Sequence, residues 1–186
     1  MRCFIAVDIN DKISGRIDKL QSELKRLLKN QTGIKWVKPQ LIHLTLKFLG
    51  EIEDSQIDLI TQAIERICRG FKSFELEFSA VGTFGRPPKV LWLGIEKPVK
   101  ELQKLAADIE QACEELGFPR EDRDFSPHLT LARIKEARPD RQLPQIMDNF
   151  KKFDAGAVTV DAVCFYKSQL TSDGPVYTLL NKINFT

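Results

Sequence analysis

A tetrapeptide that occurs twice constrains this chain more than any other feature. The sequence His-Leu-Thr-Leu stands at 43–46 and again at 128–131, and these two copies contain both histidines of the 186 residues. Because only nine residues are threonine, composition alone gives a probability of about 0.002 that both histidines have a threonine two positions later. We therefore treat the pair as a signal about fold and chemistry.

The order of expected elements repeats around the two copies. Arg2, in the first strand, lies 41 positions before His43, and Lys89 lies 39 positions before His128. Hydrophobic periodicity predicts strand 2–8, a helix from Asn10–Asp11 to Gly33, strands 34–37 and 42–49, a helix from Asp54 to Gly70, and strand 73–81. After a loop at 82–89 it predicts strand 90–95, a helix from Pro98 to Gly117, strand 128–134, a helix at about 141–152, and strands 157–166 and 176–184.

This matched spacing predicts an internal duplication, with quasi-repeats at about 1–86 and 87–186. No low-complexity linker separates the halves, so we expect a single domain over 1–186 in which two lobes pack against each other. The fold class that we expect is α+β.

Composition excludes several classes of protein. The chain is 42% hydrophobic, which excludes wholesale disorder, and no apolar run approaches the roughly 18 residues of a membrane span. The N-terminal apolar stretch is too short for a signal peptide, so we expect a cytoplasmic protein. The net charge of +2 argues against a general duplex-DNA binder. The four cysteines are far apart within apolar segments, so we expect reduced core thiols, not a disulfide framework or a zinc site.

The spacing of the tetrapeptide has a chemical meaning on a strand. Successive side chains point to opposite faces, so His43 and Thr45 share one face while the leucines anchor the other, and the same holds for His128 and Thr130. Near neutral pH one imidazole can accept a proton while another donates one, and threonine hydroxyls can stabilise anionic oxygens. This set suits phosphodiester hydrolysis without a metal or cofactor. The alternative is two buried histidines bonded to core threonines.

Longer stretches around these motifs resemble a known family. They are RCFIAVDI at 2–9, HLTLKFLGEI at 43–52, PPKVLWLGI at 87–95 and FSPHLTLARIK at 125–135. Together they resemble the 2H phosphoesterases, specifically the LigT-like RNA 2′,3′-cyclic phosphodiesterases, historically called 2′-5′ RNA ligases. The resemblance covers essentially the whole chain.

The resemblance implies a bilobal α+β fold with an antiparallel sheet in each lobe, helices outside, and the active site in the groove between. It implies hydrolysis of RNA 2′,3′-cyclic phosphate ends to 2′-phosphomonoesters. His43 would be the proton donor to the leaving 3′ oxygen and His128 the acceptor that activates water, although quasi-symmetry makes these two roles hard to separate. Thr45 and Thr130 would bind the phosphate. The reverse reaction would join a cyclic phosphate to a 5′-hydroxyl without ATP.

Four further residues are candidates for substrate contact. Lys47 continues the face of His43 and Thr45 and could attract phosphate, or be a solvated rim lysine. Arg133 matches a phosphate-contacting arginine of the family, but its odd offset from His128 requires a bulge or a strand end. Phe84 and Arg86, in the expected loop, could stack on a terminal base, or Phe84 could pack under its own turn. The aromatics within expected strands, namely Trp36, Phe48, Trp92 and Tyr166, are expected in the core.

Two rival functions stay open. The same chemistry could act on a small cyclic nucleotide or an ADP-ribose cyclic phosphate, or the chain could be a nucleotide-binding 2H domain without catalysis. Whether the substrate is an RNA end or a small cyclic phosphate, we expect the enzyme to be a monomer whose partner is that substrate. We expect it to need no metal ion and to bind no membrane.

Overall fold

The α+β fold that the sequence predicts is confirmed by a computed structural model, which describes residues 1–96, 99–135, 143–172 and 174–186. The helices are α1 (Asp11–Leu27), α2 (Ile57–Cys68), α3 (Lys100–Glu115) and α4 (Leu143–Asn149). The strands are β1 (Arg2–Asp8), β2 (Ile34–Trp36), β3 (His43–Glu51), β4 (Phe74–Phe84), β5 (Val90–Ile95), β6 (Leu129–Ile134), β7 (Asp154–Val160), β8 (Ala162–Thr171) and β9 (Gly174–Asn184). Short 3-10 turns lie at Pro39–Leu41 and Asp54–Gln56.

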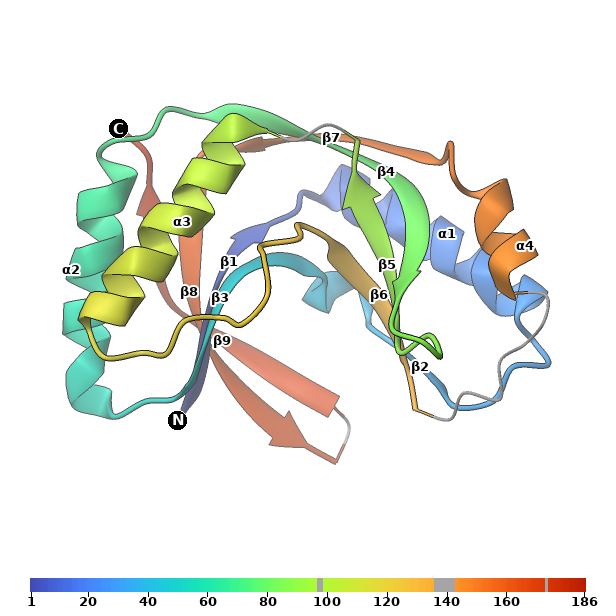
Figure 1. The fold of residues 1–186 in the computed structure, drawn as a ribbon, viewed down its shortest axis with the longest axis horizontal. Coiled ribbons are helices and arrows are strands. Elements are labelled where there is room, and N and C mark those ends of the chain that lie inside the picture. The colour runs from blue at the N-terminus through green and yellow to red at the C-terminus, as the bar shows by residue number, and fades with distance from the viewer. Residues whose placement is uncertain (97–98, 136–142, 173) are drawn as a thin grey trace.

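The strands form a curved antiparallel sheet with the order β7-β4-β5-β6-β3-β1-β8-β9, and β2 also pairs with β6 (Figure 1). The sheet has two sides, one made of β7-β4-β5-β6 with β2 and the other of β3-β1-β8-β9, and they meet where β3 pairs with β6. That junction has a single residue pair, Leu44 with Leu129. The sides are interleaved in sequence, because β4 pairs with β5 while β8 pairs with β1. That the halves 1–86 and 87–186 are quasi-repeats stays a prediction.

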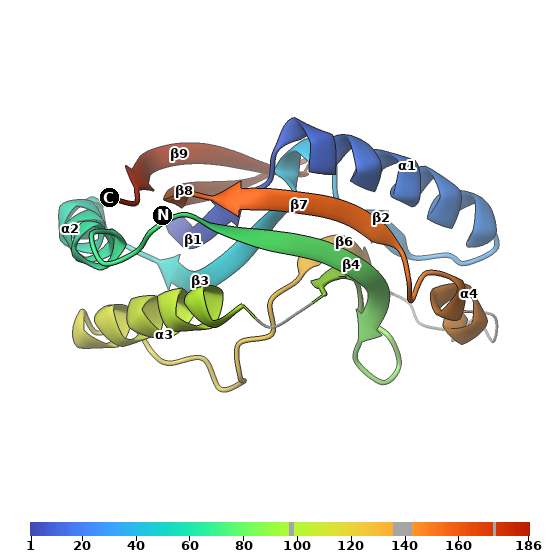
Figure 2. The ribbon, with the colours of Figure 1, turned by 90° about the horizontal axis from the view of Figure 1, so that it is seen from above.

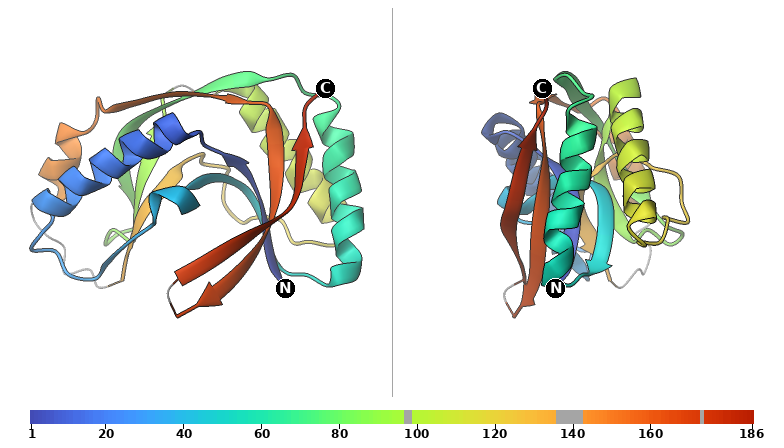
Figure 3. Two further views of the ribbon diagram at one scale, coloured as in Figure 1. Left: turned by 180° about the vertical axis from the view of Figure 1, so that it is seen from behind. Right: turned by 90° about the vertical axis from the view of Figure 1, so that its left-hand side faces the viewer.

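Helices flank both sides of this sheet. In the view of Figure 2, α1 lies above the sheet and α3 below it, and Figure 3 shows the same two helices from two further directions. Helix α1 contacts β7, whereas α3 contacts both α2 and β3. Each helix therefore covers a strand that is distant in sequence, and this ties the two sides of the sheet together. No described helix is long and apolar enough to span a membrane.

The core forms where the apolar faces of the strands meet the helices. It includes Leu44 and Leu129, which have no exposed surface, and the inward-facing leucines and isoleucines of α1 and α3. All four cysteines are buried with free thiols, as predicted. Burial raises the pKa of Cys68 and of Cys164 to about 12, so these thiols stay protonated and behave as small apolar side chains.

Several boundaries differ from the sequence prediction. Helix α1 ends at Leu27 and not at Gly33. Strand β4 continues to Phe84, so this residue ends a strand and does not lie in a loop. The segment that periodicity predicts as one strand, 157–166, is two strands separated at Asp161, because β7 pairs with β4 while β8 pairs with β1 on the opposite side of the sheet. The expected helix start at Pro98 and the first residues of the helix at 141–152 lie outside the described residues.

Candidate active site

The two tetrapeptides meet at the junction of β3 and β6. Leu44 pairs with Leu129, and both leucines point into the core. Since antiparallel neighbours of a pair also stand opposite each other, His43 lies across from Thr130, and Thr45 lies across from His128. All four side chains therefore share the other face of the sheet, which we call the histidine face. An approximate two-fold axis runs through the leucine pair.

The two imidazoles are held by matching hydrogen bonds. Nδ1 of His43 lies 2.9 Å from the carbonyl oxygen of Leu41, and Nδ1 of His128 lies 2.7 Å from that of Ser126. A carbonyl can only accept, so each Nδ1 carries a hydrogen and donates it. In the neutral ring Nε2 is then the basic nitrogen, and in the charged ring Nε2–H is the free donor. Each histidine thus offers the same nitrogen for proton transfer.

His43 is packed in aromatic surroundings. The ring of Phe4 stacks on it with centroids 4.6 Å apart, and Tyr177 meets it edge-on at 5.3 Å. This burial lowers the pKa of His43, and the Leu41 carbonyl and the charge of Asp8 offset part of that effect. Asp8 is held in turn by the hydroxyl of Tyr166, which donates to its carboxylate at 2.8 Å.

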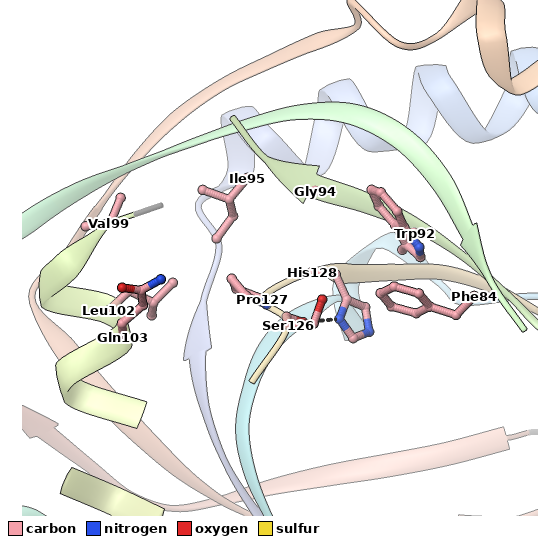
Figure 4. A pocket seen from close by; sticks show the side chains of 10 residues that line it. All are labelled: Phe84, Trp92, Gly94, Ile95, Val99, Leu102, Gln103, Ser126, Pro127 and His128. Atoms are coloured by element: carbon pink, nitrogen blue, oxygen red, sulfur yellow. Dashed lines mark hydrogen bonds between the residues drawn. The ribbon is translucent and has the colours of Figure 1, made fainter. Parts of the chain in front are cut away.

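His128 has a different environment. Phe84 meets its ring edge-on with centroids 4.9 Å apart and also packs on Trp92 at 5.2 Å. Both aromatics line a cavity beside His128 (Figure 4). The structure therefore brings Phe84 to the histidine face, whereas Arg86, two residues later, is exposed. The expectation that Trp92 belongs to the core is wrong in part, because the residue is only half-buried and lines this cavity.

The two threonines are placed as their spacing predicts. Thr45 and Thr130 are half-buried between fully buried leucines. Within the described part of the chain, neither hydroxyl has a hydrogen-bond partner. The alternative of histidines bonded to core threonines is therefore wrong, and both hydroxyls can donate to a ligand on the histidine face.

Arg133 fulfils the geometric condition that its spacing imposes. The register between β5 and β6 shifts so that Leu91 pairs with Ala132 but Trp92 pairs with Thr130, which leaves Leu131 as the extra residue of a bulge. Because of this extra residue, Arg133 points to the same face of the sheet as Thr130, although it lies an odd number of positions after His128. Its charge lowers the pKa of Tyr177, against the larger opposite effect of burial, so the guanidinium lies near the surroundings of His43.

The matching bulge on β3 makes the prediction for Lys47 wrong. Ile5 pairs with Lys47 and Ala6 with Thr45, so Leu46 is the extra residue, and the lysine turns to the buried face. Its side chain is 1% exposed, and Nζ lies 2.6 Å from Oε1 of Glu110 and 2.7 Å from the carbonyl oxygen of Pro119. Lys47 is therefore a structural residue.

Phe48 takes the position on the histidine face that Lys47 was expected to have. It is 57% exposed, so its assignment to the core is also wrong. Phe48 lies five residues after His43, as Arg133 does after His128. The bulges make these two residues equivalent about the two-fold axis, which gives one side of the site an aromatic ring and the other a guanidinium.

Comparison with known proteins identifies the family of this chain. Residues 9–171 match the family model described as the 2′-5′ RNA ligase superfamily. The chain belongs to the 2′-5′ RNA ligase superfamily. Curated members include RNA 2′,3′-cyclic phosphodiesterases of Thermotoga maritima (35% identity, covering 100% of this chain and 96% of that protein) and Archaeoglobus fulgidus (34%, covering 95% and 96%).

Two solved structures share the fold of this chain. TT0787 of Thermus thermophilus aligns with a TM-score of 0.83 and 27% identity, covering 100% of this chain and 98% of its own. Escherichia coli LigT in complex with 3′-AMP aligns with a TM-score of 0.81 and 25% identity over the same shares. The LigT-like fold that the motifs predict is confirmed.

Sequence reasoning missed the residues that surround His43. Phe4, Asp8 and Tyr177 come from β1 and β9, and no local motif links them to His43. The alternation of β1 gives a partial signal, since Phe4, Ala6 and Asp8 share one face.

Among the described residues, no cluster of His, Cys, Asp or Glu is arranged to hold a metal ion.

Proposed function

We propose that this protein hydrolyses RNA ends that carry a 2′,3′-cyclic phosphate and leaves 2′-phosphomonoesters. The observation that supports this most is the matched pair of histidines, each held through Nδ1 by a carbonyl two residues earlier so that both Nε2 atoms are free to act on one substrate. The names of the Thermotoga and Archaeoglobus relatives support the substrate class. No metal or other cofactor is part of the proposal.

In the proposed reaction, Nε2 of His128 accepts a proton from water while the water oxygen attacks phosphorus. The bond between phosphorus and O3′ breaks, and Nε2–H of His43 gives its proton to O3′. Because O2′ stays bonded to phosphorus, the product is the 2′-phosphomonoester. The cycle leaves His128 charged and His43 neutral, and proton exchange with solvent restores the starting state.

The surroundings of His43 suit an acid that releases its proton readily. Burial lowers its pKa, so the imidazolium holds its proton weakly. The cyclic phosphate is an anion, and its approach stabilises the charged ring until the leaving oxygen takes the proton. Asp8 offsets part of the burial effect and keeps the charged form accessible.

The remaining polar groups would bind the phosphate. Within the described part of the chain the hydroxyls of Thr45 and Thr130 have no hydrogen-bond partner, and exposed Arg133 shares the face of Thr130 because of the β6 bulge. Hydroxyl and guanidinium donors match the oxygens of a phosphate in its pentacoordinate transition state. Phe84 and Arg86 would contact RNA on the side of His128.

We infer that the same groups also join RNA ends, in a reaction in which a 5′-hydroxyl replaces water and a 2′-5′ linkage forms without ATP. Proton acceptor and proton donor keep their roles, because the 5′-hydroxyl loses its proton to His128 and O3′ receives one from His43. We further infer a monomer that acts in the cytoplasm. Light scattering of the purified protein and fractionation of cells test these two inferences.

Turnover of matched substrates tests the substrate class. An oligonucleotide and a mononucleotide, both ending in a 2′,3′-cyclic phosphate, are compared with ADP-ribose cyclic phosphate by kcat/KM. We expect the oligonucleotide to be preferred. A higher kcat/KM for either small compound would contradict the RNA assignment, and an absence of turnover on all three would indicate a binding domain.

A further inference from the structure

A cavity of about 280 Å³ lies directly beside His128 (Figure 4). It is bounded by the end of β4, by β5, by the start of α3 and by the residues before β6. Its lining includes Phe84, Trp92, Val99, Gln103, Ser126 and His128. The volume is below the roughly 300–1,000 Å³ of sites that enclose whole drug-sized ligands, so it suits a single planar ring system.

The aromatic wall of this cavity is fixed in place by two glycines. The indole ring of Trp92 lies across Gly82 and Gly94, and a Cβ atom at Gly94 would stand 2.9 Å from Cζ3 of that ring. A Cβ at Gly82 would come closer still. Any other residue at either position would displace the ring. Phe84 packs against Trp92, so the two rings form one aromatic wall next to the histidine.

Among the described lining residues, none carries a charged side chain apart from the ionisable ring of His128. These described side chains would not stabilise a phosphate, whereas a neutral base would gain stacking on the aromatic wall. Exposed Gln103 and Ser126 stand at the cavity with amide and hydroxyl groups that can bond to the edge of a base. The cavity thus has the chemistry of a nucleobase site.

The order of bond changes decides which base belongs there. The attacking and leaving oxygens lie on opposite sides of phosphorus in an in-line displacement. Since His43 protonates O3′ in the proposed function, the ribose of the cyclic phosphate lies on the side of His43. On that side exposed Phe48 packs against buried Phe4, which in turn contacts Tyr177. The cavity lies on the side of His128, where the nucleophile enters.

We propose that the cavity beside His128 binds the base of a nucleoside at an RNA 5′ end, whose 5′-hydroxyl replaces water as the nucleophile. His128 takes the proton of that hydroxyl, the bond between phosphorus and O5′ forms, the bond to O3′ breaks, and His43 donates its proton to O3′. The reaction consumes no other reagent. The proposal rests on the proposed function, because it uses the same two histidines in the same roles.

The test measures how one reaction divides between water and a nucleoside. An oligonucleotide ending in a 2′,3′-cyclic phosphate is incubated with excess adenosine, and the 2′-5′-joined product and the 2′-phosphate are quantified by mass spectrometry. Val99→Trp fills the cavity with a larger ring. We expect this variant to lower the ratio of transfer to hydrolysis at least about 10-fold, the loss expected from one base stack.

Two further arms make the result decisive. Leu59→Trp places the same ring on the exposed surface of α2, and its ratio should equal that of the wild type. In the wild type, 5′-deoxyadenosine has the base but no nucleophile, so it should compete with adenosine for transfer and not with the cyclic phosphate. This arm uses the unaltered protein and holds even if Val99→Trp folds poorly.

Each other outcome overturns the proposal in a distinct way. If Val99→Trp raises the KM for hydrolysis and leaves the ratio unchanged, or if 5′-deoxyadenosine competes with the cyclic phosphate, the cavity holds the base of the cyclic phosphate itself. Hydrolysis without any transfer by the wild type refutes the cavity assignment and the inferred joining reaction but leaves the proposed hydrolysis intact. An absence of hydrolysis refutes the proposed function and this inference together.

Discussion

Replacing Lys47 with methionine should destabilise the fold strongly although no ligand contact is lost. Nζ of Lys47 lies 2.6 Å from Glu110, and the two side chains are 1% and 17% exposed. Removing one partner of a buried ion pair leaves the other charge uncompensated, which costs about 3–5 kcal/mol. For a domain of this size each kcal/mol lowers the melting temperature by about 2–4 °C, so we expect a decrease of roughly 6–20 °C.

Thermal unfolding followed by circular dichroism measures this effect. Lys151→Met is the matched control, because Lys151 pairs with Asp148 in a pair whose side chains are 70% and 61% exposed. Exposed pairs contribute about 0–1 kcal/mol, so this control should melt within about 4 °C of the wild type.

A double variant separates the ion pair from simple packing. In Lys47→Met/Glu110→Leu no unpaired charge remains, and well-packed apolar residues often replace buried pairs at little cost. Part of the loss should persist, since Glu110 also accepts from the backbone N–H of Glu121 at 3.0 Å. If Lys47→Met costs less than about 1 kcal/mol, or if the double variant is as unstable as the sum of the single ones, the reasoning is refuted.

Three further predictions concern the histidine face. In Asp8→Asn the charge that raises the pKa of His43 is lost, so this pKa falls further. Because the proposed acid must hold its proton, the alkaline limb of the pH profile of kcat/KM should move to lower pH. A shift of the acidic limb would instead make His43 the base. Arg133→Lys keeps the charge but not the planar fork, so kcat/KM should fall about 10-fold, whereas a wild-type value would remove Arg133 from the phosphate site. Thr130→Val preserves shape and removes one free hydroxyl, so kcat should fall about 10–100-fold in a steady-state assay, and a decrease in stability alone would mark Thr130 as a core residue.

Much of the fold could be predicted from periodicity. The continuous apolar run of β1, the alternation of β3 and β6 and the helical spacing in α1 and α3 are local properties, and the structure agrees with them. The position where 157–166 breaks could not be predicted, because both parts are apolar and β-prone. The break at Asp161 exists because β7 and β8 pair with partners on opposite sides of the sheet.

The bulges explain both the success and the failures at the site. Alternation from His43 to Thr45 holds because no bulge intervenes, but strict alternation continued to Lys47 gives the wrong face. The extra residue at Leu46 is specified by pairing with β1, which the sequence of β3 alone does not contain. Only the motif on β6, where an arginine at an odd offset would need a bulge, gave a hint of this geometry.

The most direct test of the two-histidine mechanism is a single end-point measurement. An RNA with a 2′,3′-cyclic phosphate end is incubated in EDTA with the wild type, His43→Ala or His128→Ala, and the monoester is identified by nuclear magnetic resonance of phosphorus. We expect the wild type to yield only the 2′-phosphate, and each variant to lose about 100- to 10,000-fold in rate while its circular dichroism is unchanged. A 3′-phosphate product, complete inhibition by EDTA, or near-native turnover by either folded variant would contradict the mechanism.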